Sequence, residues 1–241
     1  MARNLTIRYQ RTFLGFVWAL LNPLVTIAIL VSVFGFVLRV GVADYWMFLV
    51  SGYFAWIFVV HTVSACAVTI RDHAHLVRNS AFPTEILVFS TAGVRLLELG
   101  IELLVVALVV GVLRHGGPPS SLLLLPVLVA LLLGLTVAVA LPVAAAAVFF
   151  TDVEFALPVG MTLLGYLSPV FYPVSLVPAS WVSWYRVNPV ADLLTMFHLT
   201  IYDGAWPPVA LVARSALVIG VLLAIGLALF RWKRDLFAEV A

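Results

Sequence analysis

Apolar residues gather along this chain in long runs that polar segments separate. Six runs cover residues 16–38, 47–70, 86–113, 121–150, 155–172 and 208–230. A helix needs about 20 mostly apolar residues to cross about 30 Å of hydrocarbon. No strand-like alternation suggests a barrel, and a helix satisfies its own backbone groups in lipid. The pattern therefore predicts an all-α polytopic membrane protein with six transmembrane helices, forming a single transmembrane domain over residues 1–241.

Composition excludes a soluble globular domain. The chain is 64% hydrophobic and 10% charged, whereas soluble domains are about 45–50% apolar and about 25% charged. The net charge of +2 is too small to indicate nucleic acid as a partner. With Cys66 as its only cysteine, the chain forms no intrachain disulfide and no thiolate metal cluster.

The distribution of cations predicts the orientation. With the N-terminus in the cytoplasm, eight cations outside the spans lie on the inner side and three on the outer side. The inner ones are Arg3, Arg8, Arg11, Arg71, Arg78, Arg231, Lys233 and Arg234, and the outer ones are Arg39, Arg114 and Arg186. This positive-inside bias places both termini in the cytoplasm. The run 16–38 exceeds the 7–15 apolar residues of a signal peptide, so we expect a span there.

The segment before the first span has the pattern of an interfacial helix. Over residues 2–14, Leu5, Tyr9 and Phe13 share one helical face, with Arg8 and Arg11 beside it. Such a helix lies along the cytoplasmic surface of the membrane. A disordered basic tail is the alternative interpretation.

The connection between the second and third runs, residues 71–85, is polar around a few apolar side chains. Leu76, Val77 and Phe82 could form the apolar knob of a short helix, and Pro83 suits the start of the next span. A knob of this kind fits a groove on another protein, although an ordinary solvated loop is also compatible. His73 and His75 lack a recognisable third ligand, so we expect no metal site.

Four prolines interrupt the fifth run and the segment after it: Pro158, Pro169, Pro173 and Pro178. Proline removes a backbone donor and breaks helix interiors, so we expect this span to break near its outer end. Residues 166–173 are thus the best candidate for a pathway-lining element, through Ser168, Pro169, Phe171, Tyr172 and Pro173. The segment 188–202 follows, with Asn188 and Pro189 at its start, and predicts a short amphipathic helix at the outer interface.

Charged and aromatic side chains inside the spans are further candidates. Arg95, Glu98 and Glu102 are spaced i, i+3 and i+7 on the third span, which places them near one helical face. An internal ion pair and a role in the substrate path or gate both explain them. Tyr53 and Trp56 could stack on sugar rings in a conduit, or belong to the interfacial aromatic belt.

Motifs for catalysis are missing from the sequence. There is no phosphate-binding loop, and Lys233 is the only lysine that could complete one. We therefore expect transport rather than catalysis, with no catalytic, cofactor-binding or metal-binding residues in this chain.

Three segments in order resemble the polysaccharide-exporting ABC type-2 permeases, relatives of O-antigen, capsule and teichoic acid exporters. Residues 8–23 (RYQRTFLGFVWALLNP) are similar to the N-terminal signature of that family. Residues 76–87, ending in FPTEIL, are similar to its coupling region. Residues 167–173 (LSPVFYP), together with Asn188-Pro189, resemble its outer gate.

The resemblance implies a mechanism and partners. Family members have six spans, form a homodimer with a central channel, and bind two copies of a separate ATPase subunit, which holds ATP and Mg. Residues 71–85 would then be the coupling helix and Asp152 a second contact, with short outer helices re-entering between spans five and six. The implied partner contacts are Arg71, Leu76, Val77, Arg78, Phe82, Pro83, Glu85 and Asp152. The implied interfacial-helix residues are Arg8, Tyr9, Arg11 and Trp18.

The expected function is export of a lipid-linked polysaccharide across the cytoplasmic membrane of a bacterium. Two alternatives remain open from the sequence. One is an ABC exporter of a small lipid or drug. The other is an intramembrane enzyme acting on lipid-linked sugars, for which Glu98 or Glu102 would supply the acid or base.

Overall fold

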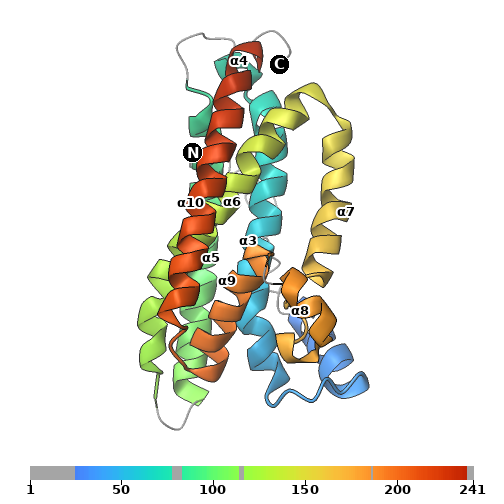
Figure 1. The fold of residues 1–241 in the computed structure, drawn as a ribbon, viewed down its shortest axis with the longest axis vertical. Coiled ribbons are helices and arrows are strands. Elements are labelled where there is room, and N and C mark those ends of the chain that lie inside the picture. Colours follow the sequence, from blue (N-terminus) through green and yellow to red (C-terminus); the bar gives the residue numbers. More distant parts are fainter. Residues whose placement is uncertain (1–24, 78–82, 114–116, 186, 238–241) are drawn as a thin grey trace, which may run out of the picture. The chain divides into compact units, whose positions relative to one another are not determined.

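The computed structural model describes residues 25–77, 83–113, 117–185 and 187–237, and every regular element in these ranges is helical (Figure 1). The elements are a helix over Val25–Val37 that ends in the π-helical η1 (Val31–Val37), α3 (Tyr45–Asp72), α4 (Ala74–Val77), α5 (Glu85–Leu113), η2 (Ser120–Leu124), α6 (Leu125–Phe149), α7 (Asp152–Tyr166), η3 (Val174–Leu176), α8 (Ala179–Tyr185), α9 (Pro189–Phe197), η4 (His198–Asp203), α10 (Val209–Lys233) and η5 (Arg234–Leu236). The predicted all-α class is confirmed for the described residues.

Four described helices are long and apolar enough to cross a membrane: α3, α5, the continuous helix Ser120–Phe149 and α10. They have 28, 29, 30 and 25 residues. Each coincides with a predicted run, namely 47–70, 86–113, 121–150 and 208–230. The apolar pattern thus located these helices to within a few residues.

The other two predicted spans are shorter in the described structure. The first run, 16–38, is described only from residue 25, as the helix Val25–Val37. The fifth run, 155–172, corresponds to α7, which has 15 residues and ends at Tyr166. At 1.5 Å per residue α7 rises about 22 Å, less than the thickness of the hydrocarbon core. Beyond Tyr166 the chain leaves the helix, as the prolines at 169 and 173 predict.

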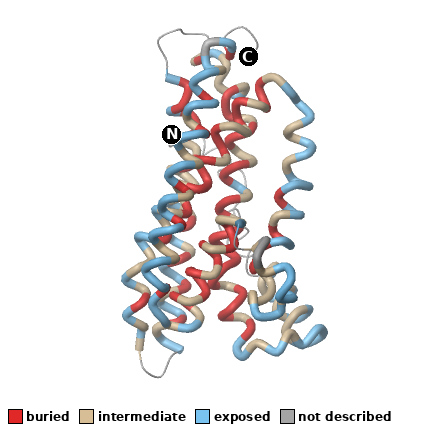
Figure 2. The backbone as a smooth tube through the Cα atoms, viewed as in Figure 1, coloured by how far each residue is buried: buried red, intermediate tan, exposed pale blue. Residues whose placement is uncertain are grey.

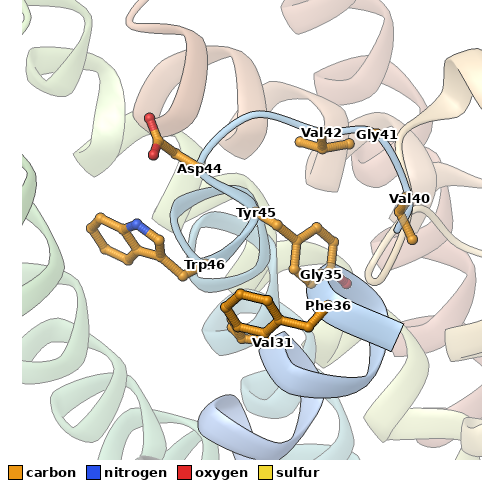
Figure 3. A pocket seen from close by; sticks show the side chains of 9 residues that line it. All are labelled: Val31, Gly35, Phe36, Val40, Gly41, Val42, Asp44, Tyr45 and Trp46. Carbon is orange, nitrogen blue, oxygen red and sulfur yellow. The ribbon is translucent and has the colours of Figure 1, made fainter. Parts of the chain in front are cut away.

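The chain divides into two compact units, Met1–Val50 and Ser51–Ala241, and α3 begins in the first and continues into the second. In the first unit, three residues of the loop before α3 have left-handed φ: Arg39, Gly41 and Asp44. This loop borders a pocket of about 250 Å³ (Figure 3), where Tyr45 points toward the helix carrying Gly35. Ring contacts from Tyr45 to Phe34 and Phe48 help to hold the loop in place.

The second unit is built around the α6–α10 pair, whose helices lie side by side (Figure 1). A Cβ atom on Gly226 of α10 would lie 2.7 Å from the carbonyl oxygen of Ala138 on α6. A Cβ atom on Gly134 of α6 would lie 3.1 Å from Ile219 Cγ2. Small residues let membrane helices approach closely enough for their backbones to pack. Glycine at these two positions therefore sets the spacing of the pair.

Helix α9 packs on both members of this pair. The Asn188 side chain caps it by accepting a hydrogen bond from the Val190 amide at 3.0 Å, and Pro189 occupies the first turn. Its apolar residues are all buried: Val190, Ala191, Leu193, Leu194, Met196 and Phe197. The predicted short helix is thus present and packs on α6 and α10, while its place at the outer membrane interface stays a prediction. Arg214 of α10 pairs with Asp192 at 2.5 Å, which neutralises the one acid of its first turn.

Helix α7 is packed very differently from α9. It stands apart from its neighbours over most of its length in Figure 1, and Figure 2 shows it mainly exposed. Phe155, Val159 and Leu163 are 78%, 71% and 60% exposed, whereas Met161 and Gly165 near its C-terminal end are buried. In this chain, α7 is therefore supported mainly toward its two ends.

Candidate functional site

The segment that follows α7, residues 166–173, forms a tight turn that we call the corner. The Val170 amide donates to the carbonyl of Ser168 at 2.8 Å. Ser168 and Val170 have no exposed surface, although each belongs to a segment without regular structure. Buried irregular backbone is tolerated at membrane depth only where protein or a water-filled cavity surrounds it. The corner is therefore an ordered turn that the surrounding protein of the second unit buries.

His198, the first residue of η4, connects the corner to α3. Its Nε2 lies 2.8 Å from the carbonyl oxygen of Pro169, and its Nδ1 lies 2.6 Å from Ser51 Oγ. A carbonyl only accepts, so Nε2 carries a proton and donates it to Pro169. In the neutral ring, Nδ1 is then the acceptor for the Ser51 hydroxyl. One buried side chain thus joins three segments that are far apart in sequence.

Asn188 holds the neighbouring corner residue. Because its Oδ1 accepts from the Val190 amide, its Nδ2 faces the corner and donates to Ser168 Oγ at 2.9 Å. Helix α9 lies between Asn188 and His198. The two ends of this short buried helix therefore hold consecutive residues of the corner.

Tyrosines occupy the second half of the corner. The Tyr172 hydroxyl donates to the carbonyl of Tyr166 at 2.5 Å and contacts the hydroxyl of Tyr185 at the end of α8. Burial, followed by the hydrogen bond with Tyr172, raises the pKa of Tyr185, so this hydroxyl stays protonated at neutral pH. The rings of Tyr166 and Phe171 lie 5.7 Å apart. These contacts join α8 to the corner.

Trp56 of α3 lies against the last turn of α7. A Cβ atom on Gly165 would be 2.9 Å from Trp56 Cζ2, so only glycine fits beside the indole ring without displacing it. Tyr53, one turn earlier on α3, is also buried. The structure thus places Trp56 next to the start of the corner, while its predicted role in a gate stays a prediction. Pro173 is half-buried at the end of the same segment.

Ion pairs gather where α3 ends and α5 begins, a region that we call the coupling end. Arg71, near the end of α3, pairs with Glu154 in the first turn of α7. Glu85, the first residue of α5, is 8% exposed, and its Oε1 lies 3.2 Å from Arg231 Nε and 3.7 Å from Arg234 Nη1. Both borders of the segment 71–85 are therefore tied to other helices of the bundle.

The described part of the segment predicted to carry an apolar knob includes the short helix α4. Helix α4 forms a single turn, Val77 is buried at 4% exposure, and Leu76 is half-buried. Pro83 and Asp152 are exposed. The predicted partner contacts Arg78 and Phe82 lie outside the described residues, as do the interfacial-helix residues Arg8, Tyr9, Arg11 and Trp18.

The charged residues of α5 come together as their spacing predicts. Arg95 Nη1 and Glu98 Oε2 form an ion pair at 2.7 Å. A small cavity of about 20 Å³ lies beside them, bordered also by Glu102 and by His61 of α3. Glu98 thus pairs with Arg95 across one turn of α5. This pair agrees with the interpretation of these residues as an internal ion pair.

Two histidines lie at the coupling end, His73 in the turn after α3 and His75 in α4. His73 Nδ1 donates to the carbonyl of Thr69 at 2.9 Å, and the rings of His73 and His75 lie 6.3 Å apart. Among the described residues, no three His, Cys, Asp or Glu side chains are grouped as a metal site would need.

Sequence reasoning missed the residues that hold the corner. His198 is a titratable side chain in an apolar segment, a signal that marks functional positions in membranes. Gly52, Gly165 and Glu154 gave no comparable signal. Their roles depend on neighbours far away in the chain, as with Gly52 and His198 or Glu154 and Arg71.

Known proteins are similar to this chain along most or nearly all of its length. The family model of the ABC-2 type transporters matches residues 1–202. An O-antigen export system permease protein RfbA from Myxococcus xanthus is 29% identical over 239 residues, which cover 98% of this chain and 92% of that protein. A protein of the same name from Klebsiella pneumoniae is 24% identical over 246 residues, covering 99% and 92%.

Proposed function

Because this chain belongs to the ABC-2 type transporter family, we propose that it is the permease subunit of an ATP-driven exporter of lipid-linked polysaccharide in the bacterial cytoplasmic membrane. The observation that carries the proposal is full-length similarity to O-antigen export permeases. The family is one of transport proteins, so the alternative of an intramembrane enzyme acting through Glu98 or Glu102 is set aside. O-antigen, teichoic acid and other cell-wall glycans are the cargo class.

The proposed architecture is a homodimer of six-span subunits with both termini in the cytoplasm. The run 16–38 supplies the first span, and α7 with the corner supplies the fifth, which ends early and re-enters through α8 and α9. The exposed apolar side of α7, with Phe155, Val159 and Leu163, supports this arrangement, because a second copy around a channel would cover part of it. Membrane lipid covers the rest.

Two copies of a separate ATPase subunit, which hold ATP and Mg, complete the proposed exporter. They dock on residues 71–85 and on Asp152. The ion pairs at the coupling end support this site, because Arg71 and Glu85 connect its two borders to α7 and α10. A push on the segment would therefore reach two other helices of the bundle.

The proposed path for the glycan passes the aromatic residues near the corner. Trp56, Phe171 and Tyr172 have flat apolar faces that suit the C–H faces of sugar rings. The lipid anchor enters first and leaves sideways into the membrane, where the thinly packed α7 offers least protein in its way. Export of a small lipid or drug is the second candidate within the same family.

Deletion of the gene, followed by measurement of surface and intracellular glycan, tests the proposal. Loss of surface polymer with accumulation of polymer in the cytoplasm is the expected result. Complementation should need both this chain and its ATPase partner. Normal surface glycan in the deletion strain contradicts polysaccharide export, and an altered resistance to drugs in that strain would favour the second candidate.

A further inference from the structure

The His198 ring, which makes these hydrogen bonds, lies in close contact with the backbone of α3 at Gly52. A Cβ atom on Gly52 would lie 2.6 Å from Cε1 of the His198 ring and 2.9 Å from its Nε2. The ring therefore lies directly on the α3 backbone at the only glycine of that helix. Any side chain at position 52 would displace the ring from Pro169, from Ser51 or from both.

A hydrogen-bond path through His198 joins the corner directly to α3. Asn188 connects Ser168 to α9, and Tyr172 connects to Tyr166 and Tyr185. His198 reaches from the Pro169 carbonyl to a hydroxyl group on α3. Because the ring is 6% exposed, water cannot readily replace either bond. The His198 side chain thus ties the corner to α3 by hydrogen bonds, in addition to the packing of Trp56 on Gly165.

The C-terminal end of α3 lies at the coupling end, far along the helix from Ser51 and Gly52. Its 28 residues rise about 42 Å and end at Asp72, inside the segment proposed to meet the ATPase. A displacement of that end along the helix axis is carried to Ser51 and Gly52 near the other end, since a helix resists compression. The His198 bonds lie where such a displacement reaches the corner.

We propose that His198 is a positioning residue that latches the corner to α3, so that opening of the corner requires the His198 ring to leave Ser51 and Pro169. This inference rests on the proposed function, because it identifies the restraint on the gate of that exporter. In the latched state the corner is closed and Val170 is shielded. A shift of α3 relative to η4 breaks the Ser51–His198 bond, and because the ring lies against Gly52 of α3 it also displaces the ring from Pro169 and frees the Ser168–Val170 turn.

Thiol labelling of the corner measures the latch. The only native cysteine, Cys66, is replaced by alanine, and Val170→Cys places a reporter at a residue with no exposed surface. The exporter, assembled with its ATPase partner, is placed in lipid nanodiscs so that a soluble maleimide reaches both faces. The initial rate of labelling reports how often the corner opens.

His198→Leu removes both hydrogen bonds, and we expect the labelling rate to rise about tenfold or more. Gly52→Ala should act in the same direction while leaving His198 in place, because the added methyl group displaces the ring. Ser51→Ala, which removes one bond, should raise the rate by about fivefold. His198→Gln can still donate to Pro169 and should return the rate toward that of the parent.

Two controls separate a latch from a general loss of stability. Gly93→Ala adds the same methyl group where no atom lies within 4 Å, so its labelling rate should equal that of the parent. A second reporter, Ala144→Cys in the buried face of α6, should stay unreactive in every latch variant.

Equal rates for the parent and for Gly52→Ala and Ser51→Ala overturn the proposal. A parallel rise at Ala144→Cys also overturns it, since His198 would then stabilise the whole unit. If His198→Leu fails to accumulate in the membrane, the labelling rates of Gly52→Ala and Ser51→Ala decide whether the latch exists. The assay needs neither polymer nor ATP, so its failure is distinct from failure of polysaccharide export, which the deletion strain tests.

Discussion

Helices α6 and α7 are neighbours in sequence and both are apolar with an internal proline, Pro142 or Pro158, yet they are packed in opposite ways. Helix α6 is buried along one side against α10, with backbone approaching backbone at Gly226 and Ala138. Helix α7 is attached at Glu154 and Gly165, and most residues between them, Met161 excepted, are exposed or half-buried. Figure 2 shows the contrast directly.

This difference indicates a division of labour between a rigid pair and a movable helix. Removing α6 from α10 would break contacts along both helices at once, because interiors are close-packed. Moving α7 requires changes only near two positions. Elements that move in a mechanism come from the less stable parts of a structure. We therefore expect substitutions at the α6–α10 contact to unfold the protein, and substitutions at the α7 attachments to change how α7 moves.

The largest effect is expected from Gly226→Ala. The new Cβ atom would lie 2.7 Å from a backbone oxygen that cannot move aside. Overpacking of this kind costs about 1–3 kcal/mol, so the midpoint of thermal unfolding in detergent should fall clearly. Gly220→Ala on the same helix has no atom within 4 Å of its Cβ, and it should leave the midpoint unchanged or raise it slightly. Equal midpoints for the two variants would mean that α6 and α10 are not in close contact.

A smaller effect is expected from Gly165→Ala, where the Cβ atom would meet the Trp56 ring at 2.9 Å. An indole ring at the end of a side chain can shift more readily than a backbone carbonyl, so we expect a loss of about 1 kcal/mol or less. Gly160→Ala, on the exposed part of α7, is the matched control, since its Cβ meets nothing within 4 Å. Thermal unfolding of the two variants, measured side by side, distinguishes an attachment from a free stretch of helix.

The smallest effect on stability is expected at the Arg71–Glu154 pair. Both side chains are about 30% exposed, at 31% and 29%, and such pairs contribute about 0.2–1 kcal/mol. A double-mutant cycle with Arg71→Ala and Glu154→Ala should give a coupling energy in that range at low salt. At 1 M salt the Debye length is about 3 Å, and the coupling should shrink. A coupling energy of zero at low salt would mean that the Arg71–Glu154 pair does not hold α7 in place.

The candidate site was only partly predictable. The prolines of the fifth run and the string LSPVFYP indicated the corner, because loss of a backbone donor is a local property of the sequence. Asn188 was predicted as a cap for the same reason, and its bond to Val190 confirms it. Its second bond, to Ser168, was not predictable, because it joins two segments that only the fold brings together.

The sequence by itself determined the helices, since an apolar run in lipid has one way to satisfy its backbone. It indicated some of their ends, such as the cap at Asn188, but α6 and α7 continue through Pro142 and Pro158. The tertiary structure alone decided which sides of the helices are buried, why glycine is needed at positions 52 and 226, and that His198 meets Pro169. Hydropathy is a property of each residue, whereas packing is a property of pairs, and these pairs are separated by up to about 147 positions, as for Ser51 and His198.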